Sequence, residues 1–350
     1  MEIQELYDKA IKYHEDGKKQ EAFNYFKLAA ELGHIKATFN LGGYYYNGYG
    51  CDKNPEMTFK YWKIAADANN LNAMENISHF YFQGIGCTQN IKFGLDYCIK
   101  AADNGSVVSQ YTIGDKYYNG EDLNKNMEMA FKYLKMAADN EHATAQIRLA
   151  EMYSSGIGCV KNHDMAFKYI YMSASNGNPE AMSNLGHMYY TGTGCIKNLK
   201  KGFEYHKMAA DKGFEDAFFE VGCAYHFGKG IEKSFINAIK YYEIDTNNIK
   251  SLFNIGSIYF KEIKDFNKSF KYWKMAADKG HSVAMKNIAV AYNNGWGCEK
   301  NEDEFMRYAM MYMNNKDDDI EKSLKKSDPT GKKDYKLENG QVISRYDDMD

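Results

Sequence analysis

A spacing of 36 residues recurs along this chain and constrains its fold more than any other feature. Small residues occur at this spacing, and then at steps of 34 and 33 residues: Ala37, Ala73, Ser109, Ala145, Ala181, Ala217, Ser251 and Ala284. Eight residues after each of these starts stands a tyrosine, from Tyr45 to Tyr292. Self-similarity with a fixed period of about 20–50 residues is the signature of a repeat array. The sequence therefore predicts one repeat domain over residues 1–313, with units that begin near 1, 37, 73, 109, 145, 181, 217, 251 and 284.

Each unit is predicted to form two helices. In ATFNLGGYYYNG, Ala37, Leu41 and Tyr45 fall at i, i+4 and i+8, which places them on one helical stripe. A glycine suited to the left-handed residue that ends a helix follows in five units: Gly48, Gly84, Gly156, Gly192 and Gly295. An asparagine, a favoured N-cap, precedes the second helix in six units: Asn54, Asn90, Asn126, Asn162, Asn198 and Asn301.

Glycines and tyrosines at fixed positions predict how the helices pack. Glycine costs about 1 kcal/mol relative to alanine inside a helix, yet it recurs mid-helix at Gly42, Gly114, Gly186, Gly222 and Gly256. This recurrence predicts a neighbouring helix pressed against each glycine. Two tyrosine series at helical spacing, one starting at Tyr45 and one at Tyr61, are predicted to lie in the core with a hydrogen-bond partner for each hydroxyl.

Composition narrows the classes of function. The 350 residues are 44% hydrophobic with a net charge of −3 and a pI near 6.3, whereas a nucleic-acid-binding domain is typically basic, with a pI above about 9. The first residues carry no apolar signal region, and no run of about 18 apolar residues occurs. The sequence predicts a soluble, cytoplasmic protein with reduced cysteines, without nucleic-acid or membrane partners.

The repeat pattern resembles a known family. The small-x₃-Leu-Gly-x₂-Tyr motif of the first helix and the alanine pair of the second are similar to a tetratricopeptide unit. The longer Gly-x-Gly loop and the AADKG-type ending look more like the Sel-1-like repeat, a relative with a 36-residue unit. The resemblance implies an all-α fold, a right-handed α-α superhelical solenoid of Sel-1-like or tetratricopeptide-like helix pairs. It also implies a scaffold or adaptor that binds proteins rather than an enzyme.

The Gly-x-Gly-Cys loop, as in YSSGIGCVKN at 153–162, admits several interpretations. A phosphate-binding loop joins a strand to a helix, whereas this loop joins two helices. Stacked helices lie about 8–10 Å apart, which is too far for disulfides or one shared metal ion between equivalent cysteines. The cysteines of this loop are therefore predicted to fill space as small apolar groups: Cys51, Cys87, Cys159, Cys195 and Cys298. No disulfide, metal or cofactor is predicted.

A polar stripe and two rows of aromatic residues are the candidate binding residues. Six residues after successive starts stand His79, Asp115, Glu151 and His187. On a tetratricopeptide-like unit this position faces the concave groove. The repeat spacing argues against one metal or acid–base centre built from all four. Aromatic residues two and nine residues after the starts also map toward the groove: Phe39, Tyr46, Phe82, Tyr111, Tyr118, Tyr190, Phe219 and Phe253. Packing between neighbouring repeats is the equal alternative for these rings.

Three departures from the pattern are expected to matter. The first repeat (Leu6 to Gly33) and the repeat that starts at Ser251 lack the Gly-x-Gly loop. The repeat that starts at Ser109 has Asp122 in place of the second loop glycine. In the Ala217 unit Asp245-Thr246 replaces the alanine pair, so we expect a local packing fault. Residues 314–350 form a polar tail, flexible or weakly capping, in which Ile320 and Leu324 provide one short helical turn. Asn339-Gly340 is a hairpin signal within this tail.

The leading interpretation is a non-catalytic scaffold that holds a peptide or protein segment in the concave groove. A hydrolase, as annotated for some cysteine-rich relatives, is the first alternative. Its Ser-x-x-Lys motif occurs only at Ser323–Lys326, without the companion motifs that β-lactam hydrolysis requires. A structural component of a larger assembly is the second alternative. The partner itself is not identified by these residues.

Overall fold

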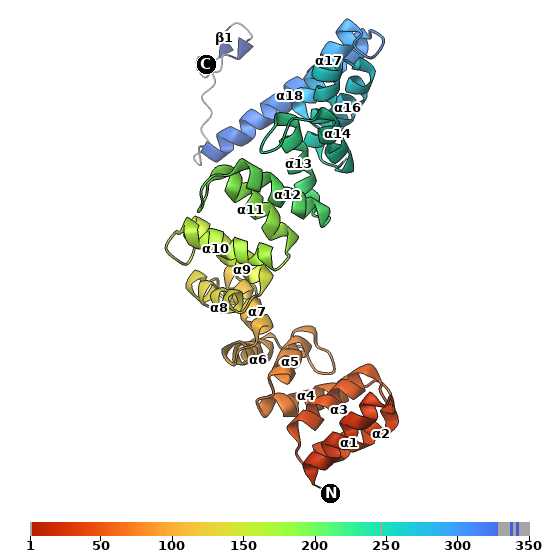
Figure 1. Ribbon diagram of the computed structural model, residues 1–350, viewed down its shortest axis with the longest axis vertical. Coiled ribbons are helices and arrows are strands. Elements are labelled where there is room, and N and C mark those ends of the chain that lie inside the picture. The colour runs from red at the N-terminus through yellow and green to blue at the C-terminus, as the bar shows by residue number, and fades with distance from the viewer. Residues whose placement is uncertain (1, 246, 328–336, 339–340, 343–350) are drawn as a thin grey trace. The chain divides into compact units, whose positions relative to one another are not determined.

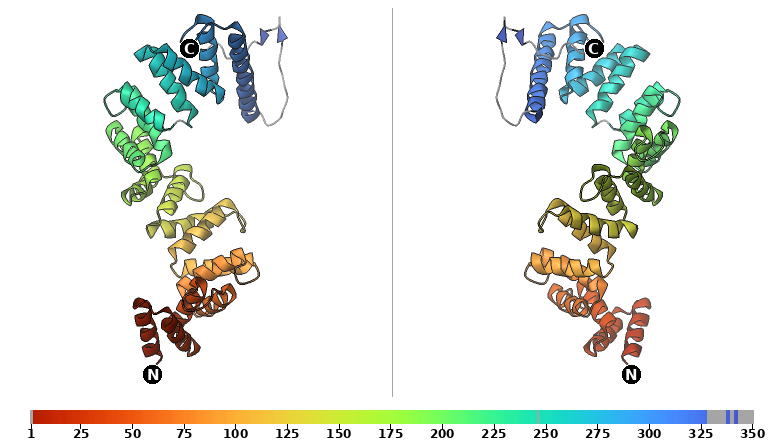
Figure 2. Two further views of the ribbon diagram at one scale, coloured as in Figure 1. Left: turned by 90° about the vertical axis from the view of Figure 1, so that its right-hand side faces the viewer. Right: turned by 90° about the vertical axis from the view of Figure 1, so that its left-hand side faces the viewer.

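Two antiparallel helices form each repeat, as the sequence predicts (Figures 1 and 2). The computed structural model describes residues 2–245, 247–327, 337–338 and 341–342. The chain divides into two compact units, Met1–Ala217 and Phe218–Asp350. The boundary lies within α13 (Glu215–Phe227), at the start of the repeat in which the sequence pattern becomes irregular.

Helices α1 to α12 of the N-terminal unit each have 13 residues. Their bounds are α1 (Ile3–Glu15), α2 (Lys19–Glu31), α3 (Ile35–Asn47), α4 (Pro55–Asp67), α5 (Leu71–Gln83), α6 (Ile91–Asp103), α7 (Val107–Asn119), α8 (Met127–Asp139), α9 (Ala143–Ser155), α10 (His163–Ser175), α11 (Pro179–Thr191) and α12 (Leu199–Asp211). Odd-numbered helices are the first helices of their repeats, and even-numbered helices are the second helices.

The C-terminal unit is less regular. After α13 it contains α14 (Phe235–Ile244), α15 (Ile249–Ile258), the π-helix η1 (Tyr259–Ile263), α16 (Phe266–Asp278), α17 (Ser282–Asn294), α18 (Glu302–Ser327), β1 (Leu337–Glu338) and β2 (Gln341–Val342). Helix α14 has 10 residues where most second helices have 13, and it ends just before the expected fault at Asp245-Thr246, of which Thr246 lies outside the described residues.

The predicted helix ends are confirmed. The side-chain oxygen of each predicted asparagine N-cap accepts a hydrogen bond from a backbone N–H three residues later, at 2.8–3.0 Å. The five predicted C-terminal glycines are left-handed, with φ between 68° and 80°. These caps satisfy backbone groups that a helix leaves without internal partners, and so they fix the register of every pair.

The second glycine of five Gly-x-Gly loops has a separate role that the sequence did not reveal. Gly158 lies against the first turn of α8, where an added Cβ would overlap the carbonyl oxygen of Met127. The same holds for Gly50, Gly86, Gly194 and Gly297, each against the first residue of the preceding second helix. The loop glycine therefore permits close approach of two backbones, one from each of two repeats.

The mid-helix glycines contact side chains of the second helix, as predicted. An added Cβ at Gly114 would lie 2.7 Å from Leu134 Cγ, and one at Gly222 would lie 2.6 Å from the Tyr242 ring. At Gly42 it would overlap the indole of Trp62. The cost of glycine in these helices is thus balanced by closer packing within each pair.

The two tyrosine series stack in eight pairs, each within one repeat, with ring centroids 5.6–6.2 Å apart. In six of these pairs the two rings lie within 15° of parallel. In several repeats the second tyrosine also donates a hydrogen bond to a carboxylate of the preceding repeat. Tyr169 donates to Asp139 at 2.7 Å, and Tyr308 donates to Asp278 at 2.6 Å. These carboxylates are the hydroxyl partners that the sequence left unnamed.

The last helix extends beyond the predicted solenoid boundary at residue 313. Helix α18 has 26 residues, twice the length of most of the others, so the predicted polar tail begins as helix and not as a single turn. Strands β1 and β2 pair antiparallel, with Leu337 opposite Val342. The predicted turn residues Asn339 and Gly340 lie outside the described residues.

Candidate functional site

On the first helices of the N-terminal unit, the positions two, three, six and nine residues after each repeat start are here called the first-helix face. The contacts between α7 and α9 in the N-terminal unit define it best. Arg148 of α9 lies over the ring of Tyr118 of α7, with the guanidinium carbon 5.1 Å from the ring centroid. This is the geometry of a cation–π contact between neighbouring repeats.

Arg148 also contacts two of the predicted carboxylates. Its Nη1 atom donates to Glu151 at 3.2 Å, and its Nη2 atom lies 3.7 Å from Asp115 Oδ1. The other oxygen of Asp115 accepts a hydrogen bond from Asn119 at 3.0 Å. Two helices thus bring together a set of residues that we call the Arg148 cluster: Tyr111, Asp115, Tyr118, Arg148 and Glu151.

The cluster is partly buried and carries a net charge of −1. Asp115 is 26% exposed and Arg148 is 33% exposed, whereas Glu151 is 48% exposed. Burial by itself would lower the pKa of Arg148, but Glu151 and Asp115 together raise it above the usual value. The guanidinium therefore stays charged. Arg148 Nε and Asp115 Oδ1 are buried and make no hydrogen bond within the described structure, although Asp115 Oδ1 faces Arg148 Nη2 in the ion pair.

Within the cluster, Tyr111 makes the contact to the N-cap of the next first helix. Its ring stacks on the imidazole of His142 with centroids 4.5 Å apart, and His142 Nδ1 accepts the backbone N–H of Ala145 at 3.2 Å. His142 is therefore the N-cap of α9, a structural role that sequence analysis did not assign. The pairs Tyr7–His34 and Phe253–His281 repeat this stack at 4.4 and 4.3 Å.

Two of the predicted aromatic residues are turned inward. Tyr190 is only 4% exposed, and its ring lies against the backbone of Gly202 and 5.1 Å from the ring of His206. Phe82 packs in the same way against Gly94. Both rings therefore belong to repeat packing. The signal was present in the sequence, because glycine replaces the usual alanine, serine or threonine of the second helix opposite these two rings.

The remaining predicted residues do not join the Arg148 cluster. Tyr46 is 52% exposed and contacts Trp62, on which Phe39 also stacks. His79 and His187 are exposed, and within the described ranges neither side chain makes a hydrogen bond or ion pair with the cluster. In the C-terminal unit, Phe219 packs near Tyr242 and Phe253 packs on His281.

Arg148 is the residue that sequence analysis missed. Five other repeats have asparagine three residues after the start, at Asn40, Asn76, Asn184, Asn254 and Asn287, whereas this repeat has one of the three arginines of the chain. The sequence signal that could have identified Arg148 was the replacement of a recurrent asparagine by a residue type that is rare in this chain. Its importance depends on the contacts with the preceding repeat, which the pattern of a single repeat does not contain.

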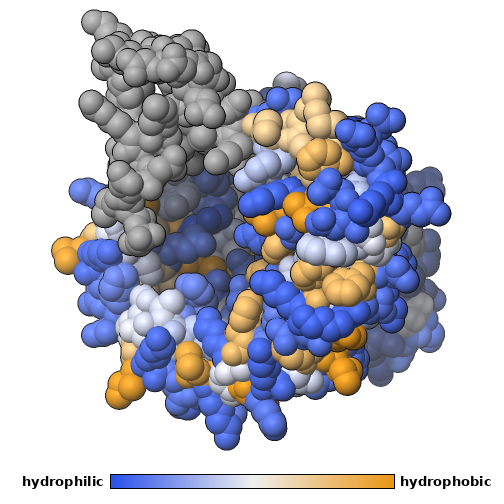
Figure 3. All heavy atoms as spheres, turned by 90° about the horizontal axis from the view of Figure 1, so that it is seen from above, coloured by the Kyte–Doolittle hydropathy of each residue, from blue (hydrophilic) through white to orange (hydrophobic). Residues whose placement is uncertain are grey.

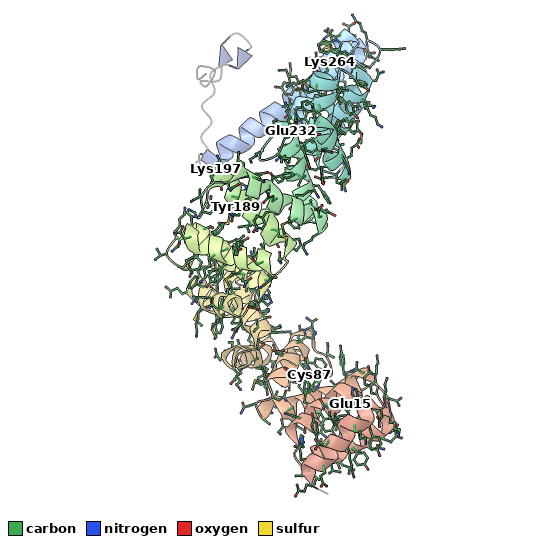
Figure 4. The ribbon with its side chains drawn as sticks, in the orientation of Figure 1. Glu15, Cys87, Tyr189, Lys197, Glu232 and Lys264 are labelled. Carbon is green, nitrogen blue, oxygen red and sulfur yellow. The ribbon has the colours of Figure 1, made fainter. Side chains whose placement is uncertain are left out.

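The loop cysteines are half-buried free thiols. Cys87 lies in the loop after α5 (Figure 4), where its thiol donates to the Phe80 carbonyl oxygen at 3.7 Å. Burial raises the pKa of this thiol, so the thiol is held in its unreactive protonated form. Within the described ranges, no three side chains of the His, Cys, Asp or Glu type come close enough to hold one metal ion.

Apolar side chains that reach the surface are scattered among hydrophilic ones on the face shown in Figure 3. Such scattering is ordinary for protein surfaces and does not by itself mark a site. In the part of the chain that the structure describes, no helix combines the length and the apolar character needed to cross a membrane.

Paired helices and loop glycines that pack against the preceding repeat define an α-helical repeat protein. A family model described as Sel1 repeat matches nine segments of the chain, at residues 12–34, 35–70, 71–106, 107–142, 143–178, 179–214, 216–244, 249–281 and 282–315. The chain belongs to the Sel1 repeat family. The predicted resemblance and the all-α fold of helix pairs are therefore confirmed, and the matched segments begin within a few residues of most predicted starts.

Solved structures show the same fold. The chain is similar to c5321, described as a protective antigen of uropathogenic Escherichia coli with an SLR fold, with 25% identity and a TM-score of 0.80 over 89% of this chain and 68% of that one. It is also similar to a Sel1 repeat protein from Oxalobacter formigenes, with 24% identity and a TM-score of 0.59 over 77% of this chain and 79% of that one. A search of curated proteins finds no match. Sel1 repeat proteins are generally protein-interaction scaffolds, and their fold is typically non-catalytic.

Proposed function

We propose that this chain is a non-catalytic scaffold that binds a peptide or protein segment along its first-helix face. The observation that carries the proposal is the Arg148 cluster. It joins charged and aromatic side chains of two repeats on one face, where the Glu151 side chain is 48% exposed. Arginine and tyrosine are, with tryptophan, the residue types enriched among side chains that dominate binding energy at protein interfaces.

The organisation of the repeat supports this function. Caps, loop glycines and paired tyrosines fix the backbone, so the residues of the first-helix face vary without a change in the frame. A repeat array presents such residues in rows, which suits an extended partner segment. The exposed carboxylate of Glu151 and the ring of Tyr118 provide polar and apolar contacts side by side.

The test compares two triple variants of the full chain in the cells where the protein occurs. The first is Asp115→Asn, Arg148→Gln and Glu151→Gln, which neutralises the cluster. The matched control is Asp96→Asn, Glu128→Gln and Lys200→Gln, which neutralises the same kinds of charge at exposed positions of second helices. Partners captured by cross-linking are quantified by mass spectrometry, and circular dichroism verifies the fold of each variant.

We expect the cluster variant to lose the captured partners by more than about tenfold, as for the loss of a central interface contact, and the control to retain them. Retention of every partner by a correctly folded cluster variant would remove the first-helix face of α7 and α9 as the binding site.

A further inference from the structure

The N-terminal repeats contain a pocket of about 280 Å³ between α1 and α3. Its base is formed by Phe26 and Tyr44, which are 1% and 4% exposed. Ile11 and Phe39 form walls, and the exposed side chains of His14 and Asn47 stand at the rim. The pocket therefore has a closed, aromatic base and an open, polar mouth.

The pocket is open because α3 has glycine at a position where the following repeats carry side chains. Gly43 lies six residues after the repeat start, the position of His79, Asp115, Glu151 and His187. An added Cβ at Gly43 would meet no atom within 4 Å. The Trp62 indole fills the space beside Gly42, so packing explains that glycine, but no side chain fills the space beside Gly43. A glycine that weakens the helix and leaves open space suits close approach of a ligand to the backbone.

The lining residues indicate an uncharged, aromatic occupant. Among the described residues, no Lys, Arg, Asp or Glu lines the pocket. The rings of Phe26 and Tyr44 meet edge to face at 5.1 Å, as do those of Tyr44 and Tyr49 at 5.7 Å, and a further ring extends such a set favourably. The amides of Asn40 and Asn47 add hydrogen-bonding groups. The occupant that matches this lining is an aromatic ring with a polar tip.

The size of the pocket favours a side chain over a free small molecule. Pockets for drug-sized ligands measure about 300–1,000 Å³, and this one falls just below that range. Its position on the first-helix face also places it in the path proposed for a partner segment. His14 Nδ1 and the Tyr44 hydroxyl already pair at 2.6 Å, so the occupant's polar tip would meet the remaining rim groups instead.

We propose that the pocket between α1 and α3 binds a tyrosine or tryptophan side chain of a partner segment, with the ring against the Gly43 backbone. This inference rests on the proposed function, because it assumes that the segment lies on the first-helix face. It adds the residue type that the partner presents and the repeats that receive it.

The first experiment titrates the full chain, labelled with ¹³C at isoleucine methyl groups, with N-acetyl-tyrosinamide and N-acetyl-tryptophanamide. The Ile11 methyl group reports ring binding by its chemical shift. We expect a saturable shift that N-acetyl-alaninamide does not cause, and that Gly43→Gln abolishes. The control Glu128→Gln places the same side chain at an exposed position of the second helix α8, outside the first-helix face, and is expected to bind like the unaltered chain. No aromatic-specific shift at Ile11, or an equal shift in Gly43→Gln, overturns the proposal.

The second experiment separates this inference from the proposed function. Random peptides displayed on phage are selected on the full chain, and their affinities are measured by fluorescence anisotropy. We expect selected peptides to contain Tyr or Trp and to lose affinity by more than about tenfold in Gly43→Gln. Peptides that are sensitive to the Arg148 cluster variant but not to Gly43→Gln overturn the pocket and keep the proposed function. Peptides sensitive only to Gly43→Gln support the pocket and remove the Arg148 cluster from the binding site, and peptides sensitive to neither overturn both.

Discussion

The pocket between α1 and α3 and the Arg148 cluster between α7 and α9 occupy equivalent places in the repeat array. Tyr7 and Tyr111 each stack on the N-cap histidine of the next first helix. Seven residues later stand His14 at the pocket and Tyr118 at the cluster. The same frame therefore supports an open aromatic hollow in one place and a filled, charged site in the other.

Two positions account for the difference. Three residues after the repeat start the pocket has Asn40, whereas the cluster has Arg148, which reaches back to the preceding helix. Six residues after the start the pocket has Gly43 and the cluster has Glu151. Because caps and loop glycines hold the backbone in both places, single side chains decide the chemistry of each site.

The largest expected effect concerns the frame behind the pocket. Gly42→Ala places a Cβ against the buried Trp62 indole, and overpacking of this kind costs about 1–3 kcal/mol. We expect a net destabilisation of about 2 kcal/mol, measured by urea unfolding. Hydrogen exchange resolved by helix should place the loss in α3 and α4. An unchanged midpoint would mean that α3 shifts freely on α4.

Removal of the arginine is expected to have the next largest effect. Arg148→Asn gives the cluster the residue found at this position in the pocket, and it leaves Asp115 beside Glu151 without a cation. Because all three side chains are partly exposed, the expected loss is about 1 kcal/mol in urea unfolding.

The control for this prediction is the double variant Asp115→Asn and Arg148→Asn. It removes the uncompensated charge and should recover part of the lost free energy of unfolding. If both variants unfold at the same urea concentration, the uncompensated charge of Asp115 costs nothing measurable.

A smaller effect of opposite sign is expected at the pocket. Gly43→Ala adds a Cβ into open space and removes the helix cost of glycine, so stability should rise by about 0.5–1 kcal/mol. The same substitution is thus expected to lower stability at Gly42 and to raise it at Gly43, the next residue of the same helix. If the unfolding temperature falls in both Gly42→Ala and Gly43→Ala, the space beside Gly43 is not open.

The smallest expected effect depends on pH and concerns the cluster side. Burial lowers the pKa of His142, whose neutral Nδ1 accepts the N–H of Ala145. In the unfolded chain the pKa is about 6.5, so the unfolded state binds the proton first as pH falls. The stabilisation is thus complete above about pH 6.5 and is lost below it, by at most the roughly 1 kcal/mol of a helix N-cap.

The matched variant is His142→Asn, which introduces the N-cap residue found at Asn70 and Asn178. Urea midpoints of the two proteins should coincide near pH 7.5 and separate near pH 5, where the variant is more stable. Parallel pH profiles would show that protonation of His142 does not affect this joint.

Much of the fold was predictable because it depends on local rules that repeat. A left-handed glycine, an asparagine N-cap and a mid-helix glycine each have a physical cause within one repeat, and the structure confirms each of them. The candidate site was predictable only in part. Asp115, Tyr118 and Glu151 were placed on one face by their spacing, but the spacing gave no reason to choose between a surface ring such as Tyr46 and an inward ring such as Tyr190.

The sequence by itself determined the repeat length, the helix pairs and the family, because these follow from periodicity and from backbone preferences of single residues. Only the tertiary structure decided that Arg148 bridges to α7, that Tyr190 is buried on Gly202 and that Gly43 opens a pocket. The physical reason is that each of these outcomes depends on side chains from two elements. Contacts between elements depend on distances in space, which a one-dimensional pattern does not contain.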